Sequence, residues 1–180
     1  FKDVTGKKYE VISESKPLVA IEEFYVMNII SEEELLKTYG NDINEAKENY
    51  ISNIKDIIVV TYSIKTAELM CQNHIKTYCA GGLMLENSLV CVGNKAVEFA
   101  TAINTDVCFI SCKGVDCDGK FTDTSEEETA IRKAFMKNCS VRVMLMTQNK
   151  FNSKHFHTLC EASEIDYLIS DGEIPSELTE

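Results

Sequence analysis

The sequence predicts an α/β fold in which helices cover both faces of a mostly parallel β-sheet. Two observations lead to this prediction. From about residue 57, short apolar segments alternate with segments of helical character. Most of the apolar segments are nearly continuous, which is typical of strands buried on both faces of a parallel sheet. The chain has 180 residues, a length that suits one domain, so we expect a single domain over residues 1–180.

The first half of this alternation begins with a β-branched run. Residues 56–63 (DIIVVTYS) are rich in Ile and Val, which favour strands, and residues 64–73 (IKTAELMCQN) follow as a helix. Residues 75–82 (IKTYCAGG) form a short strand that ends in paired glycines. Residues 89–94 (LVCVGN) are another short strand, and residues 95–104 (KAVEFATAIN) are a helix.

The second half begins with the apolar run DVCFISCKG, a strand at residues 106–114. A helix follows at residues 125–139, where Ser125 and Glu128 have the spacing of a capping box. The pattern then predicts a strand, a helix and a last strand, at residues 141–148, 154–163 and 166–171.

The first fifty residues have a weaker pattern. Residues 9–19 contain a short strand in our interpretation, and residues 16–40 are mainly helical. Residues 41–54 resemble a capped helix that starts at Asn41 or Asp42, because Asn and Asp are favoured N-caps.

Charge and hydropathy exclude several classes of protein. The net charge is −11 and no Lys/Arg-rich run occurs, so we do not expect this segment to bind nucleic acid directly. No stretch approaches the 18 apolar residues that a membrane span needs, and no secretory signal is visible, so we expect a cytoplasmic protein. Because the first residue is Phe1 rather than Met, we expect a piece of a longer protein.

Eight cysteines raise the question of metal or redox chemistry. Most of them lie inside apolar runs, as small buried side chains do, and a reduced setting suits them. Cys108, Cys112 and Cys117 lack the recurring pairs of a zinc site, so we expect no metal and no cofactor. Lys113 lies near Cys112 and Cys117 and favours thiolates there, which leaves a redox-responsive thiol as an alternative.

Five stretches carry a resemblance to a known family. They are IIVVTYSIKTAELM (57–70), AGGLMLENSLVCVGNKAVEFA (80–100), DVCFISCKGVDCDGKFTDTSEEETAIRKAFM (106–136), LMTQNKF (145–151) and IDYLISD (165–171). In this order they resemble the C-terminal sensor domain of the DeoR family of bacterial sugar-metabolism regulators. The resemblance implies a fold like that of ribose-5-phosphate isomerase and the CoA transferases. It also implies a phosphorylated sugar or similar small anion as effector, and DNA contact only through an N-terminal helix-turn-helix that this chain lacks. Family members assemble as dimers or tetramers, so we expect a homo-oligomer.

The resemblance also implies where the effector binds. Ligands of open α/β sheets lie beyond the carboxyl ends of the strands. Lys113 and Arg132 would offer cationic donors to phosphate, Glu128 or Asp116 would accept bonds from sugar hydroxyls, and glycines allow close approach. The expected ligand-binding residues are Gly40, Asn41, Thr61, Tyr62, Ser63, Gly81, Gly82, Lys113, Gly114, Asp116, Glu128, Arg132 and Lys150.

Plain structural readings of the same residues stay open. Glu128 and Arg132 have the i,i+4 spacing of an ion pair on a helix. Gly81 and Gly82 suit an ordinary turn that needs a positive φ, and Lys150 suits a solvated loop.

Four residues at three places in the expected pocket depart from the family pattern. In TYGND, Gly40 is kept but Asn41 and Asp42 replace two threonines of the family's phosphate loop, and an added carboxylate repels an anion. Tyr62 replaces an asparagine, and Thr147 replaces an aspartate. These changes leave open a different ligand, or a degenerate sensor that serves as an oligomerisation module.

An isomerase of the same fold is the remaining alternative. Moving a proton between adjacent carbons needs a carboxylate base over the substrate. Ser111 and Cys112 stand where such isomerases carry acidic residues. We therefore expect no enzyme and no catalytic residues.

Overall fold

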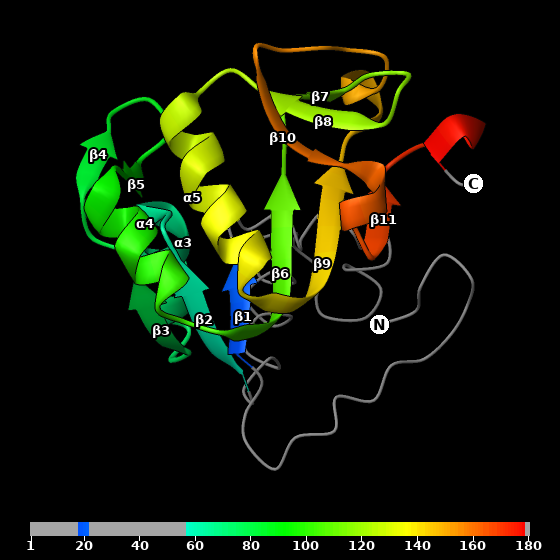
Figure 1. The fold of residues 1–180 in the computed structure, drawn as a ribbon. Helices are drawn as coiled ribbons and strands as arrows, with labels where there is room; N and C mark the ends of the chain where they lie inside the picture. The colour runs from blue at the N-terminus through cyan, green and yellow to red at the C-terminus, as the bar shows by residue number, and fades with distance from the viewer. Residues whose placement is uncertain (1–17, 22–56, 179–180) are drawn as a thin grey trace, which may run out of the picture.

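The computed structural model describes residues 18–21 and 57–178 of the chain (Figure 1). Its centre is a six-stranded sheet in the order β11-β9-β6-β1-β2-β3. Every neighbouring pair in this sheet is parallel, which confirms the predicted fold class. The strands are β1 (Leu18–Ile21), β2 (Ile58–Thr61), β3 (Lys76–Cys79), β6 (Thr105–Ser111), β9 (Cys139–Met146) and β11 (Tyr167–Ser170).

In the described residues three helices cover the two faces of this sheet, and all three were predicted. They are α3 (Ile64–Gln72), α4 (Asn94–Thr101) and α5 (Glu126–Lys137). Consecutive residues of β2 point to opposite faces, as in any strand. Val60 packs in the core cluster that contains residues of α4 and α5, whereas Val59 packs with Met70 of α3. The helices therefore lie on both faces, as the continuous apolar strands require.

The N-terminus of α5 shows half of the predicted capping box. The Ser125 hydroxyl accepts a hydrogen bond from the Glu128 N–H at 3.1 Å. The Ser125 N–H, however, donates to the Asp123 carboxylate at 3.4 Å. The Glu128 carboxylate accepts bonds from Arg132 and Ser88. Glu128 is thus directed into the molecule.

The helix predicted at residues 154–163 is wrong. Residues His157–Glu161 form strand β10, which pairs antiparallel with β8 (Lys120–Asp123), and β8 pairs with β7 (Gly114–Val115). Leu159 and Cys160 are consecutive residues, and both are buried. A register shift between Thr158 and Cys160 interrupts the usual alternation of buried and exposed residues along the strand. This bulge conceals the strand pattern. Only a 3₁₀ turn, η3 (Ala162–Glu164), follows.

The helix predicted at residues 16–40 is also wrong at residues 18–21. These residues form β1, a strand between β6 and β2 in the sheet. The strand predicted within residues 9–19 overlaps β1 only at its last two residues. The rest of both ranges, and the helix predicted at residues 41–54, lie outside the described residues.

A small hairpin and a three-stranded sheet complete the described part of the fold. The hairpin joins β4 (Leu83–Leu85) to β5 (Val90–Val92), of which only β5 was predicted. The β10-β8-β7 sheet lies beyond the carboxyl ends of β6 and β9 (Figure 1). In the described residues no helix is long and apolar enough to cross a membrane.

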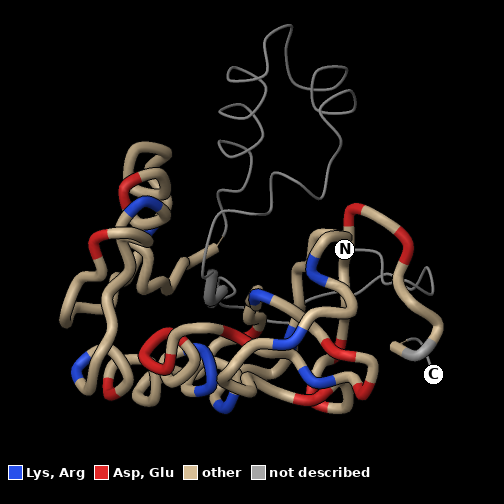
Figure 2. The backbone as a smooth tube through the Cα atoms, turned by 90° about the horizontal axis from the view of Figure 1, so that it is seen from above, with Lys and Arg blue, Asp and Glu red and all other residues tan. Residues whose placement is uncertain are grey.

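The strand order reverses beside β1. The chain proceeds from β1 to β2 and β3 on one side, and through β6, β9 and β11 on the other. The gap between the carboxyl ends of β1 and β6 is therefore the topological switch point, where open α/β sheets bind ligands. Acidic and basic residues are interspersed along the described backbone (Figure 2).

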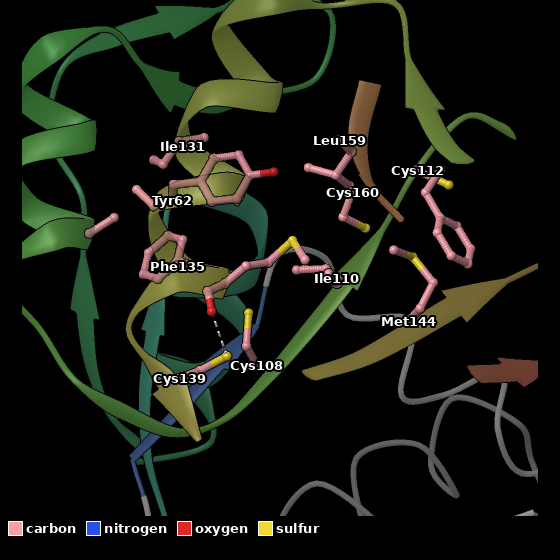
Figure 3. Packing of buried hydrophobic residues seen from close by; sticks show 14 of the residues in the cluster. Tyr62, Cys108, Ile110, Cys112, Ile131, Phe135, Cys139, Met144, Leu159 and Cys160 are labelled. Carbon is pink, nitrogen blue, oxygen red and sulfur yellow. Dashed lines mark hydrogen bonds between the residues drawn. The ribbon is translucent and has the colours of Figure 1, made fainter. Parts of the chain in front are cut away.

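Most cysteines belong to the core, as the sequence predicted. Figure 3 shows Cys108, Cys112, Cys139 and Cys160 among the buried side chains of the larger cluster. Cys91 is buried as well, and all eight thiols are free. Burial raises the pKa of the Cys160 thiol far above its ordinary value. The Cys112 thiol contacts the Met146 sulfur at 3.3 Å.

We expect two classes of thiol in the folded protein. Cys71, Cys79 and Cys117 are exposed and should react with Ellman's reagent at neutral pH, Cys79 most slowly because partial burial raises the pKa of its thiol. The other five should react only after denaturant is added. Counting released thionitrobenzoate before and after unfolding tests this. If Cys112 reacts as fast as Cys117 in the native protein, Cys112 is accessible and the redox-responsive reading gains support.

Candidate functional site at the carboxyl edge

Ser111 and Lys150 meet at the carboxyl ends of two neighbouring strands. Ser111 is the last residue of β6, and Lys150 lies in η2 (Gln148–Lys150), just after β9. The Lys150 ammonium donates to the Ser111 hydroxyl at 2.9 Å, and that hydroxyl donates to the Leu145 carbonyl at 2.9 Å. Lys150 is therefore directed back to the switch point and is not a freely solvated loop residue. Ser111 was absent from the expected ligand-binding residues, although its place at the end of β6 puts it at the carboxyl edge of the sheet.

Lys113 and Gly114 follow directly along the chain. The Lys113 side chain is exposed, while its N–H donates to the Thr122 carbonyl at 3.0 Å. Gly114 is buried in β7, and a Cβ there would lie 2.7 Å from the Ser153 carbonyl oxygen. Gly114 is thus required by the close approach of the loop that follows Lys150. The predicted importance of this glycine has a packing cause.

Asp116 holds the turn between β7 and β8. Its carboxylate accepts bonds from the N–H groups of Asp118 at 3.1 Å and Lys120 at 3.0 Å, and it pairs with Lys154 at 3.0 Å. The Lys120 N–H, with help from Lys154, holds the pKa of Asp116 below its ordinary value. The same pair raises the pKa of Lys154. The carboxylate is therefore engaged within its own turn.

Arg132 lies at the centre of a buried polar network. It is 5% exposed, and its guanidinium contacts Asp123 at 2.5 Å and Glu128 at 2.7 Å. Its Nε donates to the Tyr62 hydroxyl at 3.0 Å. Ser88, in the β4–β5 turn, donates to the other Glu128 oxygen at 3.3 Å. We call Tyr62, Ser88, Asp123, Glu128 and Arg132 the Arg132 network.

The Glu128–Arg132 pair has the predicted i,i+4 spacing, but it is a buried pair and not a surface one. The sequence analysis did not single out Asp123, which the structure shows to be 1% exposed. It also accepts bonds from the N–H groups of Thr124 and Ser125 at the start of α5. The acidic residue that ends β8 therefore fixes both the guanidinium and the helix entry.

The residues of VVTYS hold the turn between β2 and α3. The Thr61 hydroxyl accepts a bond from the Ser63 N–H at 3.1 Å, and the Ser63 hydroxyl accepts one from Thr66 at 3.3 Å. All three of Thr61, Tyr62 and Ser63 are buried. The Tyr62 ring stacks on Phe135 with centroids 6.1 Å apart and lies between α5 and the sheet (Figure 3).

Gly81 and Gly82 form the exposed turn between β3 and β4. Gly82 has a φ of +141°, and a Cβ there would meet the Val92 carbonyl oxygen at 2.5 Å. Nothing lies within 4 Å of a Cβ at Gly81. The ordinary-turn reading thus accounts for Gly82. Gly40 and Asn41 lie outside the described residues.

The expected site residues accordingly fall into separate groups. One contains Lys150 and the neighbouring Lys113, together with the unpredicted Ser111, and another is the Arg132 network. Within the part of the chain that the structure describes, no three His, Cys, Asp or Glu side chains gather in a way that could hold a metal ion.

Sequence comparison places this chain in a class of protein, the sensor domains of transcriptional regulators. The family model described as the DeoR C-terminal sensor domain matches residues 44–172. The chain therefore belongs to the DeoR C-terminal sensor domain family, which confirms the resemblance seen in its motifs.

Curated relatives are transcriptional regulators. The HTH-type transcriptional regulator GolR of Listeria innocua is 29% identical over 119 residues, which is 66% of this chain and 47% of that protein. The HTH-type transcriptional regulator YulB of Bacillus subtilis is 26% identical over 117 residues, or 64% and 45%. The HTH-type transcriptional repressor GlcR of Bacillus subtilis is 26% identical over 120 residues, or 66% and 46%. The chain spans about half the length of these relatives.

Two solved structures align with the chain, one of them with a TM-score above 0.5. The eIF2B delta subunit from Chaetomium thermophilum aligns with a TM-score of 0.52 at 12% identity, over 91% of this chain and 52% of that one. Ribose 5-phosphate isomerase A from Neisseria gonorrhoeae aligns with a TM-score of 0.42 at 13% identity, over 77% and 47%. The eIF2B likeness supports the fold and says nothing about ligands.

Proposed function

We propose that this chain is the effector-binding domain of a cytoplasmic bacterial repressor of sugar metabolism, and that its effector is a phosphorylated sugar or similar small anion. The observation that carries this proposal is the Lys150–Ser111 contact at 2.9 Å, beside the switch point of the sheet. Membership of the sensor family supports the effector-binding role. The repressor role draws on the name of GlcR.

The chemistry favours lysines as the phosphate ligands. Ammonium groups form strong charge-assisted bonds to phosphate oxygens. Lys113 is exposed and Lys150 lies at the same edge, next to the Ser111 hydroxyl. The Arg132 guanidinium, in contrast, already contacts two carboxylates, which neutralise it. We therefore assign the anion to Lys113 and Lys150, and to Arg132 the task of fixing the surrounding elements.

Signal transfer would be a population shift. In the full regulator, an effector that binds one arrangement of a homo-oligomer more tightly would favour that arrangement. The DNA-binding heads would then change their spacing, and repression would be relieved. DNA would be contacted only by the N-terminal helix-turn-helix of the longer protein.

Lys150→Ala should weaken effector binding without unfolding the domain. Hydrogen bonds to charged groups contribute about 1.5–3 kcal/mol, so the Kd for a bound phosphosugar should rise roughly tenfold to a hundredfold. The measurement is a thermal-shift screen of phosphorylated sugars, followed by calorimetry with the best of them. Lys137→Ala is the matched control, because Lys137 is exposed at the end of α5, next to the start of β9 and so at the opposite, amino edge of the sheet.

The outcomes separate three functions. A shift that requires the phosphate group and Lys150 supports the sensor. Turnover of a pentose or hexose phosphate that Glu128→Gln abolishes would instead indicate an isomerase. No shift with any sugar phosphate would favour an assembly module. One observation favours the assembly module as the second candidate: Tyr62 and Arg132 are buried against each other and not presented at the surface.

A further inference from the structure

The strand β3 leaves one edge of the described sheet open. It is the last strand in the order, and β2 is its partner. The Ala80 N–H donates to the Thr61 carbonyl at 2.8 Å, and Cys79 is in register with Thr61. Because backbone groups alternate in direction along a strand, those of Thr77 and Cys79 point away from β2. Among the described strands none pairs with this edge, which is a ready template for another strand.

The segment that carries this edge is apolar and contains no acidic residue. Residues 75–85 (IKTYCAGGLML) contain one charged residue, Lys76, in a chain of which 26% is charged. Tyr78 of β3 is 44% exposed and Leu83 of β4 is 67% exposed. An exposed apolar surface beside an open strand edge is typical of a protein–protein contact.

The sequence of β3 is complementary to itself. Lys76 and Tyr78 share one face of the strand, where the Lys76 ammonium lies 5.4 Å from the centre of the Tyr78 ring. In an antiparallel pair of two β3 strands with Thr77 at the two-fold axis, each Lys76 faces the Tyr78 ring of the other copy. The two Thr77 residues exchange both backbone hydrogen bonds. Cation–π contact and Thr–Thr pairing are both favourable across strands.

We propose that β3 is a self-association surface, on which a second copy of this chain adds its own β3 antiparallel around a two-fold axis at Thr77. The pairing makes one continuous sheet from two copies. A second copy is the occupant that fits, because two-fold pairing needs a self-complementary surface and the Lys76-Thr77-Tyr78 order provides one. Each copy carries a net charge of −11, so contact is least repulsive where acidic residues are absent. The inference rests on the homo-oligomer proposed above and names its surface.

Sedimentation velocity of the 180-residue chain, with reducing agent and no effector, tests the surface. We expect concentration-dependent dimers for the wild type. Tyr78→Lys places lysines opposite each other across the axis and should raise the dissociation constant at least about tenfold. Phe156→Lys is the matched control, because Phe156 is 89% exposed on the loop before β10 and should leave the dimer unchanged.

A charge-swapped double variant guards against misfolding as the cause. Lys76→Glu combined with Tyr78→Lys creates two opposite-charge pairs across the axis and should restore the dimer. Hydrogen exchange gives a second readout, since the amides of Thr77 and Cys79 should be protected in the dimer and lose that protection on dilution. A monomeric wild type, or a dimer that Tyr78→Lys leaves unchanged, overturns the proposal. Effector binding is measured separately with Lys150→Ala, so the failure of one proposal is distinguishable from failure of the other.

Discussion

Arg132→Ala should lower the free energy of unfolding by about 3–5 kcal/mol, the cost of removing one partner from a buried ion pair. The substitution leaves the Asp123 carboxylate, 1% exposed, without its guanidinium, and Glu128 loses the same partner. The Tyr62 hydroxyl also loses its donor. For a domain of this size such a loss lowers Tm by roughly 6–20 °C. Urea unfolding followed by circular dichroism measures it.

Lys133→Ala is the matched control, since it removes the neighbouring cation of α5 from an exposed position. Its unfolding midpoint should stay close to that of the wild type. The interpretation also predicts that Asp123→Asn is less damaging than Arg132→Ala, because the amide oxygen still accepts from Thr124 and Ser125. An Arg132→Ala variant within about 1 kcal/mol of the wild type would contradict the view that this network is structural.

Five of the six strands of the main sheet, all except β1, were predictable from local composition. Runs such as IVVT in β2 and VCFIS in β6 are apolar on both faces, and this is the condition that a sheet covered by helices on both sides imposes. Helix α5 was predictable because Ser125 has the spacing of a cap and the helix period follows it. In these segments the local and the tertiary signals agree.

The second sheet was not predictable for a physical reason. The partner of β10 is β8, more than thirty residues away, and no local pattern specifies that pairing. The bulge after Thr158 places Leu159 and Cys160 in the core together, so the alternation of a strand is lost. The four residues of β8, KFTD, resemble a polar loop until β10 and β7 bury Phe121 and Thr122. Tertiary pairing here overrides local propensity.

The candidate site divides in the same way. The positions of Lys150 and the Lys113 loop at the carboxyl edge were predictable, because each follows an apolar strand of the parallel sheet. The contacts of Asp123 with Arg132 and of Ser88 with Glu128 were not predictable. Neither pair has a sequence spacing that a single helix or strand would bring together. Their contacts exist only once β8 and the β4–β5 turn are in place.

Gly114→Ala should disturb stability and effector binding together. A Cβ at this buried position meets both the hydroxyl and the carbonyl oxygen of Ser153, the latter at 2.7 Å, and lies 3.1 Å from the His155 ring. Overpacking of this kind costs about 1–3 kcal/mol. Ser153 is tied to the site, because its hydroxyl donates to the Lys150 carbonyl at 2.9 Å. Moving Ser153 should therefore shift Lys150 and lower effector affinity.

Gly81→Ala provides the control, because a Cβ there has nothing within 4 Å and the residue needs no positive φ. Its stability and its effector affinity should match the wild type. Adding Ser153→Gly to Gly114→Ala removes the clash with the hydroxyl but not that with the backbone oxygen, so we expect only partial recovery. Unfolding curves and calorimetry on the same four proteins test this, and full stability of Gly114→Ala would show that the loop yields without cost. Loss of affinity in Gly114→Ala but not in Gly81→Ala would place the effector beside β7 and the Lys150 loop, away from the β3–β4 turn.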